Sequence, residues 1–549
     1  MVDLRNLTAL IIDPNSGMRS SVHNMLTSCG ITKVDHAVSS GTAIRQVRAK
    51  QFDLILCEYD LAEGQDGQQL LEDLRYNKLI PLWTMYFMLT AERSSKKVVS
   101  AAELAPTDYL LKPFTHDGML ERVGRAVERR SVFMPVFQLI EHGDLNRAIK
   151  TCEAGEAANP RLAADFLRLR AECNVTLGRA ADAEALYGKL LETKSMGWAR
   201  LGLAKTLFMQ ERYADAERTL EALIAESDKF LDAYDMLAKT REAMGKMDEA
   251  KAILETAVAI SPHAVRRLRA LGKLALETGD LARAESSLQQ VVAKAKYSEF
   301  RDPEDHVQLA TTLVQKGDTK AAATVIRDMD KALGHQKKTA ACHAFLTGMV
   351  HEANGDPEAA AAEFASAAAA SADASGLSND LKLALAKSCL EHDMQGDASS
   401  ILLDVMNNSG DNAAAAKAIA VFADAGHGDL AASVAQESRR QVAALLSSGA
   451  EKAKAGDFRG AVSAMTQAAQ KMPENGQVVF NAAVAALKCL ENVGWDESLG
   501  ENARWYIDNA RRLDPANTRL GVLTELYIGI LRKYKIQPAA IVAKAPARI

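Results

Sequence analysis

The chain has 549 residues, too many for one compact domain, and fits several domains or one small domain followed by a repeat array. Hydrophobic residues make up 48% and charged residues 25%, which excludes a disordered chain. The net charge of -5 gives no general attraction to nucleic acid or to an anionic membrane surface. No run of 18 apolar residues occurs, so no membrane span is expected. The seven cysteines form no CxxC pair or metal-ligand spacing, so we expect reduced thiols and a cytoplasmic protein.

The first 130 residues alternate short apolar runs with helical segments. The predicted strands cover residues 7–12, 34–38, 54–57, 85–89 and 109–111. The predicted helices cover residues 16–29, 42–50, 95–104 and 116–130, and a further helix follows the Asp66-Gly67 turn and runs through Leu74. Continuous apolar strands that alternate with helices predict an α/β domain, a doubly wound parallel five-stranded sheet covered on both faces.

A polar side chain follows four of the five predicted strands. These residues are Asp13, Glu58, Thr90 and Lys112. Folds of this type place their functional groups at the carboxyl ends of the strands. Two carboxylates, a hydroxyl and an ammonium group are therefore expected to meet in one pocket.

Residues 5–130 resemble the receiver domain of bacterial two-component response regulators, which has a flavodoxin-like fold. Thr90-Ala91 and Lys112-Pro113-Phe114 match two motifs of that family, and Tyr109 matches its aromatic switch position. The resemblance implies that Thr90 and Lys112 contact phosphoryl oxygens and that the Lys112–Pro113 bond is cis. It also implies a histidine kinase or phosphotransfer protein as a partner.

Two positions depart from the family pattern. Glu58 stands where the resemblance places the phosphoacceptor aspartate, and Asp60 lies past the strand end and is a poor substitute. Pro14 follows Asp13 where a second acid is usual, so a Mg²⁺ site built on Asp13 and Glu58 is expected to be weak or lost. Glu58 is interpreted either as a mimic of the phosphorylated state, with about half the charge of a phosphoryl group, or as half of an ordinary ion pair with Lys112 in a domain kept for docking. An engineered Asp-to-Glu change is a third interpretation.

From residue 132 the strand signal ends and a helical hairpin recurs about every 34 residues. Its marker is a glycine followed by a polar residue, at Gly143, Gly178, Gly245, Gly279, Gly317, Gly355, Gly396, Gly428 and Gly456, with Glu211 replacing glycine in one unit. In one unit Tyr234, Leu237, Ala238, Gly245, Ala250, Leu254, Ala257 and Pro262 occupy the eight defining positions of a tetratricopeptide repeat. Residues 132–535 resemble tetratricopeptide (TPR) repeat proteins, which implies an all-α solenoid of nine to eleven hairpins.

These features predict three parts, a receiver-like domain at 1–130, a TPR-like array with C-terminal capping helices at 132–535, and a flexible tail at 536–549. The concave surface of such an array usually binds another protein. Basic pairs within it, such as Arg266-Arg267, are expected on solvated faces.

The predicted function is a signalling adaptor and not an enzyme, since no catalytic motif occurs in a fitting context. The receiver pocket is assigned to Asp13, Glu58, Thr90, Tyr109 and Lys112. The alternatives are an active response regulator that is phosphorylated on its receiver, or a structural scaffold that assembles with itself. The resemblance also suggests a homodimer through residues 95–130.

Overall fold

The computed structural model describes residues 4–61, 66–91, 106–193, 196–262, 264–296, 298, 300–373, 376–408, 412–514, 517, 519–536 and 546. The helix predicted at 95–104 and nearly all of the tail predicted at 536–549 lie outside these residues. The chain forms two compact units, one of Met1–Glu141, Arg147–Val175 and Ala180–Thr312 and the other of His142–Asn146, Thr176–Arg179 and Leu313–Ile549. The first therefore contains the N-terminal sheet together with the first part of the helical array.

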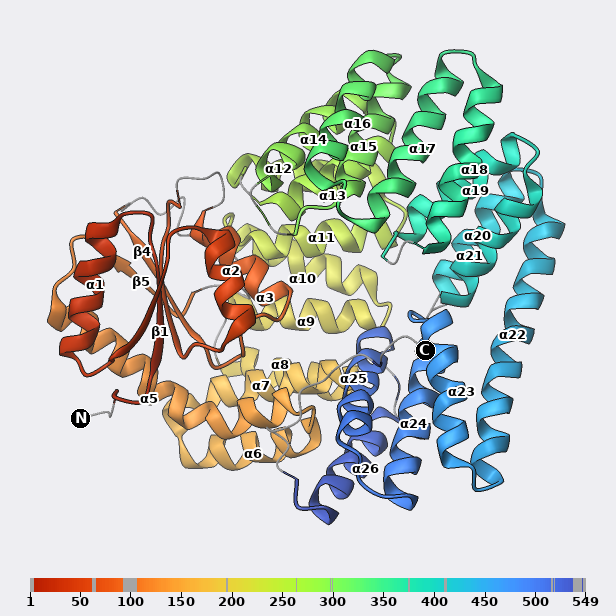
Figure 1. Cartoon of the computed structure of the whole chain (residues 1–549). Helices are drawn as coiled ribbons and strands as arrows, with labels where there is room; N and C mark the ends of the chain where they lie inside the picture. The colour runs from red at the N-terminus through yellow and green to blue at the C-terminus, as the bar shows by residue number, and fades with distance from the viewer. Residues whose placement is uncertain are drawn as a thin grey trace. The chain divides into compact units, whose positions relative to one another are not determined.

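The N-terminal part is built on a five-stranded sheet in the order β2-β1-β3-β4-β5, with every neighbouring pair parallel (Figure 1). The strands are β1 Thr8–Ile12, β2 Lys33–Ala37, β3 Leu54–Glu58, β4 Met85–Thr90 and β5 Asp108–Leu111. The strand β2 lies on one side of β1, and the later strands β3 to β5 follow on the other side. The boundary between β1 and β3 is therefore the switch point of a doubly wound sheet. The fold class predicted for this part is confirmed.

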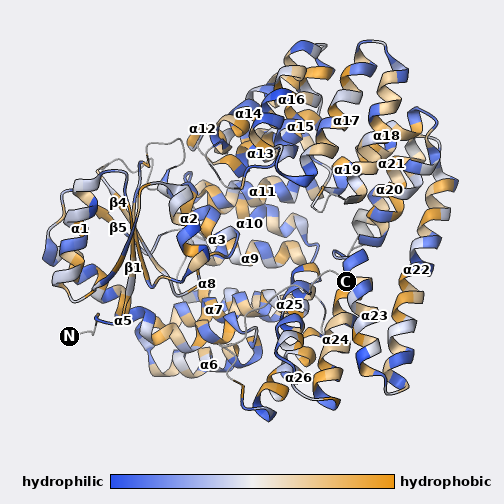
Figure 2. Cartoon of the chain, viewed as in Figure 1, coloured by the Kyte–Doolittle hydropathy of each residue, from blue (hydrophilic) through white to orange (hydrophobic). Residues whose placement is uncertain are grey.

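The two faces of the sheet carry separate cores because successive strand residues point to opposite sides. Ala9 and Ile11 pack with α1 and α5, while Leu10 and Ile12 pack with α2 and α3. The helices of this part are α1 Ser16–Ser28, α2 Ser40–Ala49, α3 Gly67–Tyr76 and α5 His116–Glu141. The central strands β1, β3 and β4 are largely apolar and buried, as expected for strands covered on both faces, whereas the edge strand β2 is mostly polar (Figure 2).

Helix α5 is longer than the sequence predicts. It runs without a break to Glu141, past Pro135, whereas an end at Arg130 was expected. The boundary predicted at residues 130–132 therefore falls inside one helix. Phe133 and Val136 are buried, so the extension continues to pack beyond the sheet.

The rest of the described chain is helical, apart from its connecting segments. Its helices are α6 Leu145–Ala158, the short 3-10 helix Pro160–Leu162, α7 Ala163–Thr176, α8 Ala180–Thr193, α9 Gly197–Met209, α10 Tyr213–Glu226, α11 Leu231–Ala243, α12 Met247–Ile260, α13 Val265–Glu277, α14 Leu281–Ala295, α15 Pro303–Gln315, α16 Thr319–Leu333, α17 Lys337–Ala353, α18 Pro357–Asp373, α19 Asn379–Glu391, α20 Gln395–Asn408, α21 Asn412–Asp424, α22 Gly428–Lys454, α23 Phe458–Lys471, α24 Gly476–Asn492, α25 Glu497–Leu513 and α26 Leu520–Lys533. Serial helix pairs of this kind confirm the predicted TPR solenoid.

Most of the described hairpins share one turn geometry. Ten described residues, each two positions after the end of a helix, have φ between 59° and 83°, namely Gly143, Gly178, Glu211, Gly245, Gly279, Gly317, Gly355, Asp393, Gly426 and Gly456. At Gly279 the amides of Gly279 and Asp280 donate to Leu276 O and Ala275 O at 3.2 and 2.8 Å, which closes the helix in a Schellman motif. Ten such turns agree with the nine to eleven hairpins predicted.

Two of the predicted turn markers are wrong. Gly396 lies inside α20 and Gly428 is the first residue of α22. The left-handed residues in those units are Asp393 and Gly426. Aspartate tolerates this conformation better than most side chains, so the turn at residue 393 forms without glycine.

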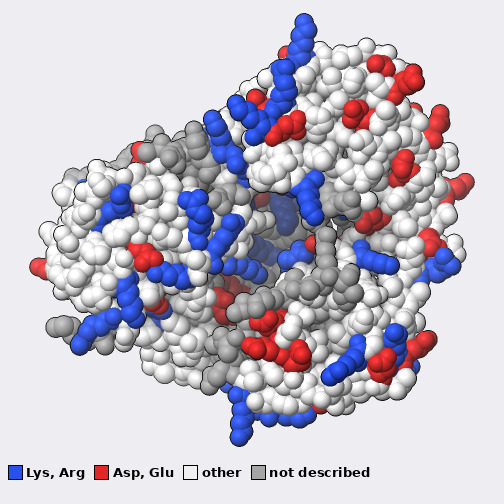
Figure 3. Space-filling model, in the orientation of Figure 1, with Lys and Arg blue, Asp and Glu red and all other residues white. Residues whose placement is uncertain are grey.

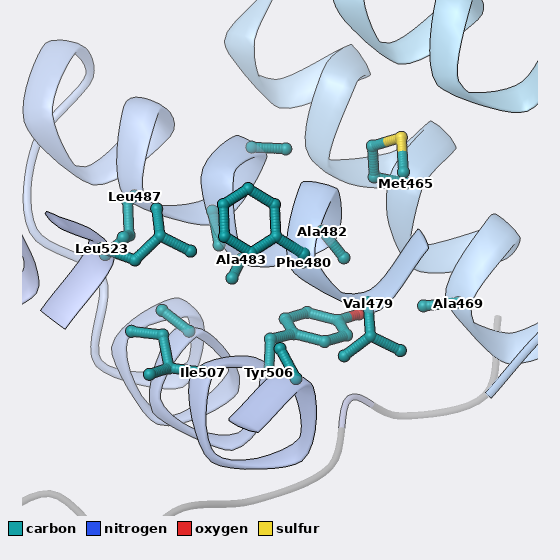
Figure 4. Packing of buried hydrophobic residues seen from close by; sticks show 14 of the residues in the cluster. Met465, Ala469, Val479, Phe480, Ala482, Ala483, Leu487, Tyr506, Ile507 and Leu523 are labelled. Atoms are coloured by element: carbon teal, nitrogen blue, oxygen red, sulfur yellow. The ribbon is translucent and has the colours of Figure 1, made fainter. Parts of the chain in front are cut away.

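The last helices share one apolar core, and Figure 4 shows part of it. Tyr506 and Ile507 of α25 lie beside Val479 and Phe480 of α24, and Leu523 of α26 joins the same cluster. The hydroxyl groups of Tyr506 and Thr466 lie 3.2 Å apart, so the buried tyrosine keeps a hydrogen-bond partner. Helices α23 to α26 are therefore joined by one shared core.

The surface carries charged side chains of both signs, as the small net charge of the chain suggests. Acidic and basic side chains both appear across the face drawn in Figure 3, without a continuous basic surface. None of the helices in the described ranges combines the length and the apolar character that a bilayer crossing requires. Every one of the seven cysteines is a free thiol.

Candidate functional site

The parallel register brings the predicted pocket residues to one edge of the sheet. Asp13 directly follows β1, Glu58 is the last residue of β3 and Thr90 is the last residue of β4. Glu58 pairs with Leu89, and Thr90 pairs with Leu111 of β5, so Lys112 comes next along the same edge. The amide of Lys112 donates to Thr90 O at 2.8 Å, which fixes the start of the loop after β5.

The centre of the site is the ammonium group of Lys112. Its Nζ forms an ion pair with Oε2 of Glu58 and lies 3.5 Å from Oδ2 of Asp13. The exposed fractions of the Lys112, Glu58 and Asp13 side chains are 20%, 14% and 3%, so the cluster is largely removed from solvent. A partly buried cation between two carboxylates interacts more strongly than an exposed surface pair.

The remaining carboxylate oxygens are also occupied. Asp60 N donates to Glu58 Oε1 at 3.3 Å, and Asn15 N donates to Asp13 Oδ1 at 2.8 Å. The guanidinium group of Arg19 donates to the carbonyl oxygens of Asp13 and Pro14 at 2.7 and 3.0 Å. Sequence reasoning did not identify Arg19, which sits one turn into α1 and reaches back over the loop after β1.

Helix α3 begins directly beneath the pocket. Gly67 N donates to Tyr59 O at 2.7 Å, and a Cβ on Gly67 would lie 2.5 Å from the carbonyl oxygen of Glu58. Only glycine permits this approach, because side-chain carbons do not come so close to a backbone oxygen. The buried hydroxyl of Tyr86 donates to Gly67 O at 3.0 Å, and burial raises the pKa of this tyrosine. The sequence marked the turn before α3 but not its contact with Glu58.

Tyr109, the fifth residue predicted for the pocket, packs against the core of the sheet. It is a partly buried residue packed against the apolar cluster that joins the sheet to α2 and α3, and burial raises its pKa to about 12. Arg122 of α5 donates to Tyr109 O and to Asp108 Oδ1, each at 2.9 Å. The ring is therefore held on the core side of β5.

The described residues do not fit a Mg²⁺ site. No group of three or more metal-ligating side chains occurs among them. Asp13 and Glu58, the two predicted ligands, both contact Lys112, and Pro14 offers no side-chain oxygen. In the described site, both carboxylates thus face the ammonium group of Lys112 and form a closed cluster with it.

In the array, one predicted solvated residue is buried. Arg267 is only 7% exposed and donates through Nε and Nη2 to the two carboxylate oxygens of Asp235, at 2.6 and 2.8 Å. Two residues along α13, Arg269 forms the same bidentate contact with Asp305 at 2.5 and 2.8 Å. These pairs join α13 to α11 and to α15, so the assignment of Arg267 to a solvated face was wrong.

Comparison with known families agrees with this structure. Residues 9–124 match the response regulator receiver domain. Residues 139–195, 178–240 and 242–301 match tetratricopeptide repeat families. The chain is thus a receiver domain fused to tetratricopeptide repeats.

Two curated relatives each match 22–23% of the chain. Chemotaxis protein CheY-3 of Vibrio cholerae is 29% identical over 128 residues, 23% of this chain and 95% of the relative. Chemotaxis protein CheY of Pseudomonas aeruginosa is 28% identical over 120 residues, 22% of this chain and 95% of the relative.

Solved structures match each part separately. A tetratricopeptide repeat protein from Parabacteroides merdae covers 47% of this chain and 98% of its own, with 16% identity and a TM-score of 0.32. The chemotaxis response regulator CheY4 of Vibrio cholerae covers 22% of this chain and 98% of its own, with 23% identity and a TM-score of 0.21.

Proposed function

We propose that this receiver–TPR fusion is a two-component signalling adaptor whose receiver is held in one state by an internal ion pair and whose array binds a protein partner. The contact of Lys112 Nζ with both Glu58 and Asp13 carries the proposal. Receiver domains recognise kinases or phosphotransfer proteins, and we propose such a protein as a partner of this receiver. The role is binding and not catalysis.

The charge balance of the pocket supports constitutive behaviour. An aspartyl phosphate brings about two negative charges to the lysine of a receiver, and Glu58 supplies one without any phosphorylation. Asp13 lies on the same ammonium group, 3.5 Å away, so two carboxylates face Lys112 at rest. An incoming phosphoryl group would have to compete with both for the same cation.

A phosphodonor experiment tests this proposal. The full chain is incubated with acetyl phosphate and Mg²⁺, and its intact mass is measured. We expect no added phosphoryl group on the natural sequence. The double variant Pro14→Asp/Glu58→Asp restores the acidic residues that the resemblance implies, and it is expected to gain one phosphoryl group. A phosphoryl group on the natural chain that disappears in Glu58→Ala or Asp60→Ala would instead support an active, phosphorylated response regulator.

The docking interpretation of Glu58 has a separate outcome. If the ion pair serves only the receiver fold, Glu58→Gln leaves partner binding unchanged, whereas a phosphomimetic role requires that binding falls. The partner is first identified by affinity purification from the native host. Its affinity for the natural chain and for the variant is then measured with purified components.

Self-assembly is the remaining alternative. The mass of the purified chain in solution distinguishes a homodimer, proposed to form through residues 95–130, from a monomeric adaptor. A stable dimer that binds no other protein would favour a structural scaffold. The domain limits 1–130, 132–535 and 536–549 remain proposals, as does a cytoplasmic location.

A further inference from the structure

The receiver contacts the array through the outer side of α3. Asp73 Oδ2 accepts a hydrogen bond from Ser298 Oγ at 3.0 Å. Arg266 of α13 places its Cζ 5.1 Å from the ring centroid of Tyr76, within the range of a cation–π contact. The side chains involved lie on the first compact unit, 225 residues apart in the case of Asp73 and Ser298.

An aromatic residue anchors the same contact beside α2. Phe300 packs against the apolar cluster beneath α2 and α3, and Arg48 of α2 has its Cζ 5.6 Å from the Phe300 ring. Phe300 N donates to Ser298 Oγ at 3.1 Å, which holds the two residues in one local arrangement. The segment before α15 therefore reaches the receiver core with an apolar side chain.

Glu72 lies between the receiver and α13. It is one helical turn from Tyr76, so both side chains share one side of α3. Gln68 Nε2 donates to Glu72 Oε1 at 3.4 Å, while Oε1 of Gln68 is buried with no partner among the described residues. Burial raises the pKa of Glu72 to about 7, against the opposing attraction of Arg266 and Arg267. A carboxyl group is thus desolvated at the contact, and no described residue forms an ion pair with it.

On the array side of the contact, α13 forms ion pairs with the helices on both sides of it, α11 and α15. Asp235 of α11 and Asp305 of α15 hold Arg267 and Arg269 of α13 in bidentate pairs. The Nη1 of Arg267 is buried with no hydrogen-bond partner in the described structure. Two ion pairs therefore hold the side chains of this face of α13 in place, and Arg267 keeps one buried N–H group that could donate a further hydrogen bond.

At its other end, α3 is fixed to the phosphoryl-site edge of the receiver. Its first residue, Gly67, lies against the backbone of Glu58 and donates to Tyr59 O. A capping box between Asp66 and Gln69 keeps this end rigid. A single helix of 10 residues thus joins the pocket to α13.

We propose that the surface formed by Arg266 and Arg267 of α13 together with Ser298 and Phe300 of the segment before α15 is an exchangeable docking surface that α3 occupies in cis. The partner that replaces α3 is a helix with a carboxyl side chain that is desolvated on docking and an aromatic residue one turn away, as Glu72 and Tyr76 are. Tyr76 is 68% exposed even when docked, so the contact covers its ring incompletely and leaves room for exchange. This inference rests on the proposed binding role of the array and specifies its partner.

A charge-swap series in the full chain tests the cis contact by hydrogen–deuterium exchange. Glu72→Arg places like charges at α3 and α13, and Arg266→Glu does so with Asp73 and Glu72. Each is expected to raise amide exchange in α3 and α13 roughly tenfold. The double variant Glu72→Arg/Arg266→Glu is expected to recover most of the protection. The control Arg125→Glu, on the exposed side of α5, should leave both helices unchanged.

A peptide probe tests the exchange itself. It carries residues 66–77 with a staple replacing Leu70 and Leu74, which face the receiver core and not the array. We expect it to protect α13 in the Glu72→Arg chain and to have a much smaller effect on the natural chain, where α3 competes. The same peptide with alanine at positions 72 and 76 should not protect α13.

Two results would overturn the inference. Unchanged exchange in both charge reversals would show that α3 does not rest on α13. Failure of the peptide to protect α13 in the opened chain would exclude a replaceable helix. Neither result depends on phosphorylation, so both are distinct from failure of the proposed function, which the phosphodonor experiment decides.

Discussion

At the residue scale, the pocket is a small electrostatic unit with one cation and two carboxylates. Lys112 Nζ is the partner that Asp13 Oδ2 and Glu58 Oε2 share. Removing one member of such a cluster leaves the others charged and partly desolvated, which costs more than the attraction that was lost. The ammonium group therefore matters most for stability, because without it two like charges remain at close range.

Lys112→Met is expected to lower the local free energy of unfolding of the sheet by about 2 kcal/mol, less than for a fully buried pair because Lys112 keeps some solvent contact. Native-state hydrogen exchange of the β1 and β3 amides measures the effect. Lys112→Met/Glu58→Met removes one carboxylate as well and should recover part of the loss. Equal losses in the two variants would show that repulsion between Asp13 and Glu58 is not the cause.

Gly67 offers a steric prediction at the same site. An added Cβ would lie 2.5 Å from Glu58 O and 2.9 Å from Met88 Sδ. Because the first of these atoms is backbone, Gly67→Ala is expected to destabilise the receiver by about 2 kcal/mol. Gly124→Ala in α5 meets nothing within 4 Å and should instead stabilise by roughly 0.5–1 kcal/mol. Urea unfolding of both variants in the full chain compares them, and equal effects would contradict the steric argument.

The sequence predicted the pocket because strand ends in a parallel sheet meet at one edge, and this rule needs only the order of the elements. Asp13, Glu58 and Lys112 lie together for that reason. Arg19 and Gly67 were missed because their roles are contacts with backbone oxygens, which leave no mark in hydrophobic periodicity. The only indication of the role of Arg19 in the sequence is that a basic residue stands one turn into α1.

At the element scale, the array depends on how each first helix ends. The left-handed residue always lies two positions past the helix, and eight of the ten are glycine. The marker of a glycine followed by a polar residue predicted most of these turns. It failed where the glycine lies inside a helix, as Gly396 does. The end predicted for the last receiver helix at Arg130 was also too early, because α5 continues past Pro135 to Glu141 although proline removes one helical hydrogen bond.

Glu211 provides a test of this turn geometry. Its φ of 59° is costly for a side chain that is neither glycine nor asparagine. Glu211→Gly is therefore expected to stabilise the surrounding hairpins by about 1 kcal/mol, and Gly279→Ala, with φ of 77° and no atom near its added Cβ, to destabilise by a similar amount. Hydrogen exchange of α9 and α13 reports each change locally. A destabilising Glu211→Gly would mean that the side chain itself holds the turn.

At the scale of the whole molecule, the receiver and the array meet through residues far apart in sequence. Tyr76 and Arg266, or Asp73 and Ser298, carry no local signal of their pairing. Periodicity reports which side of a helix is buried but not against what, so the sequence predicted two parts and not their contact. The raised pKa of Glu72, for example, arises from its burial in this contact, which the sequence of α3 does not indicate.

The pH dependence of docking follows from Glu72. Gln68 and Asp66 face it from α3, and Arg266 and Arg267 face it from α13; desolvation outweighs the arginines and raises the pKa from 4.5 to about 7. An undocked Glu72 is exposed and keeps an ordinary pKa, so the docked state binds the proton more tightly. Docking should therefore be strongest below pH 4.5, weaken as pH rises toward 7, and become constant above it. Exchange in α13, corrected for intrinsic rates, should rise across this interval in the natural chain and stay flat in Glu72→Gln. A slope of the opposite sign would mean that Glu72 is docked as a charged partner of the arginines.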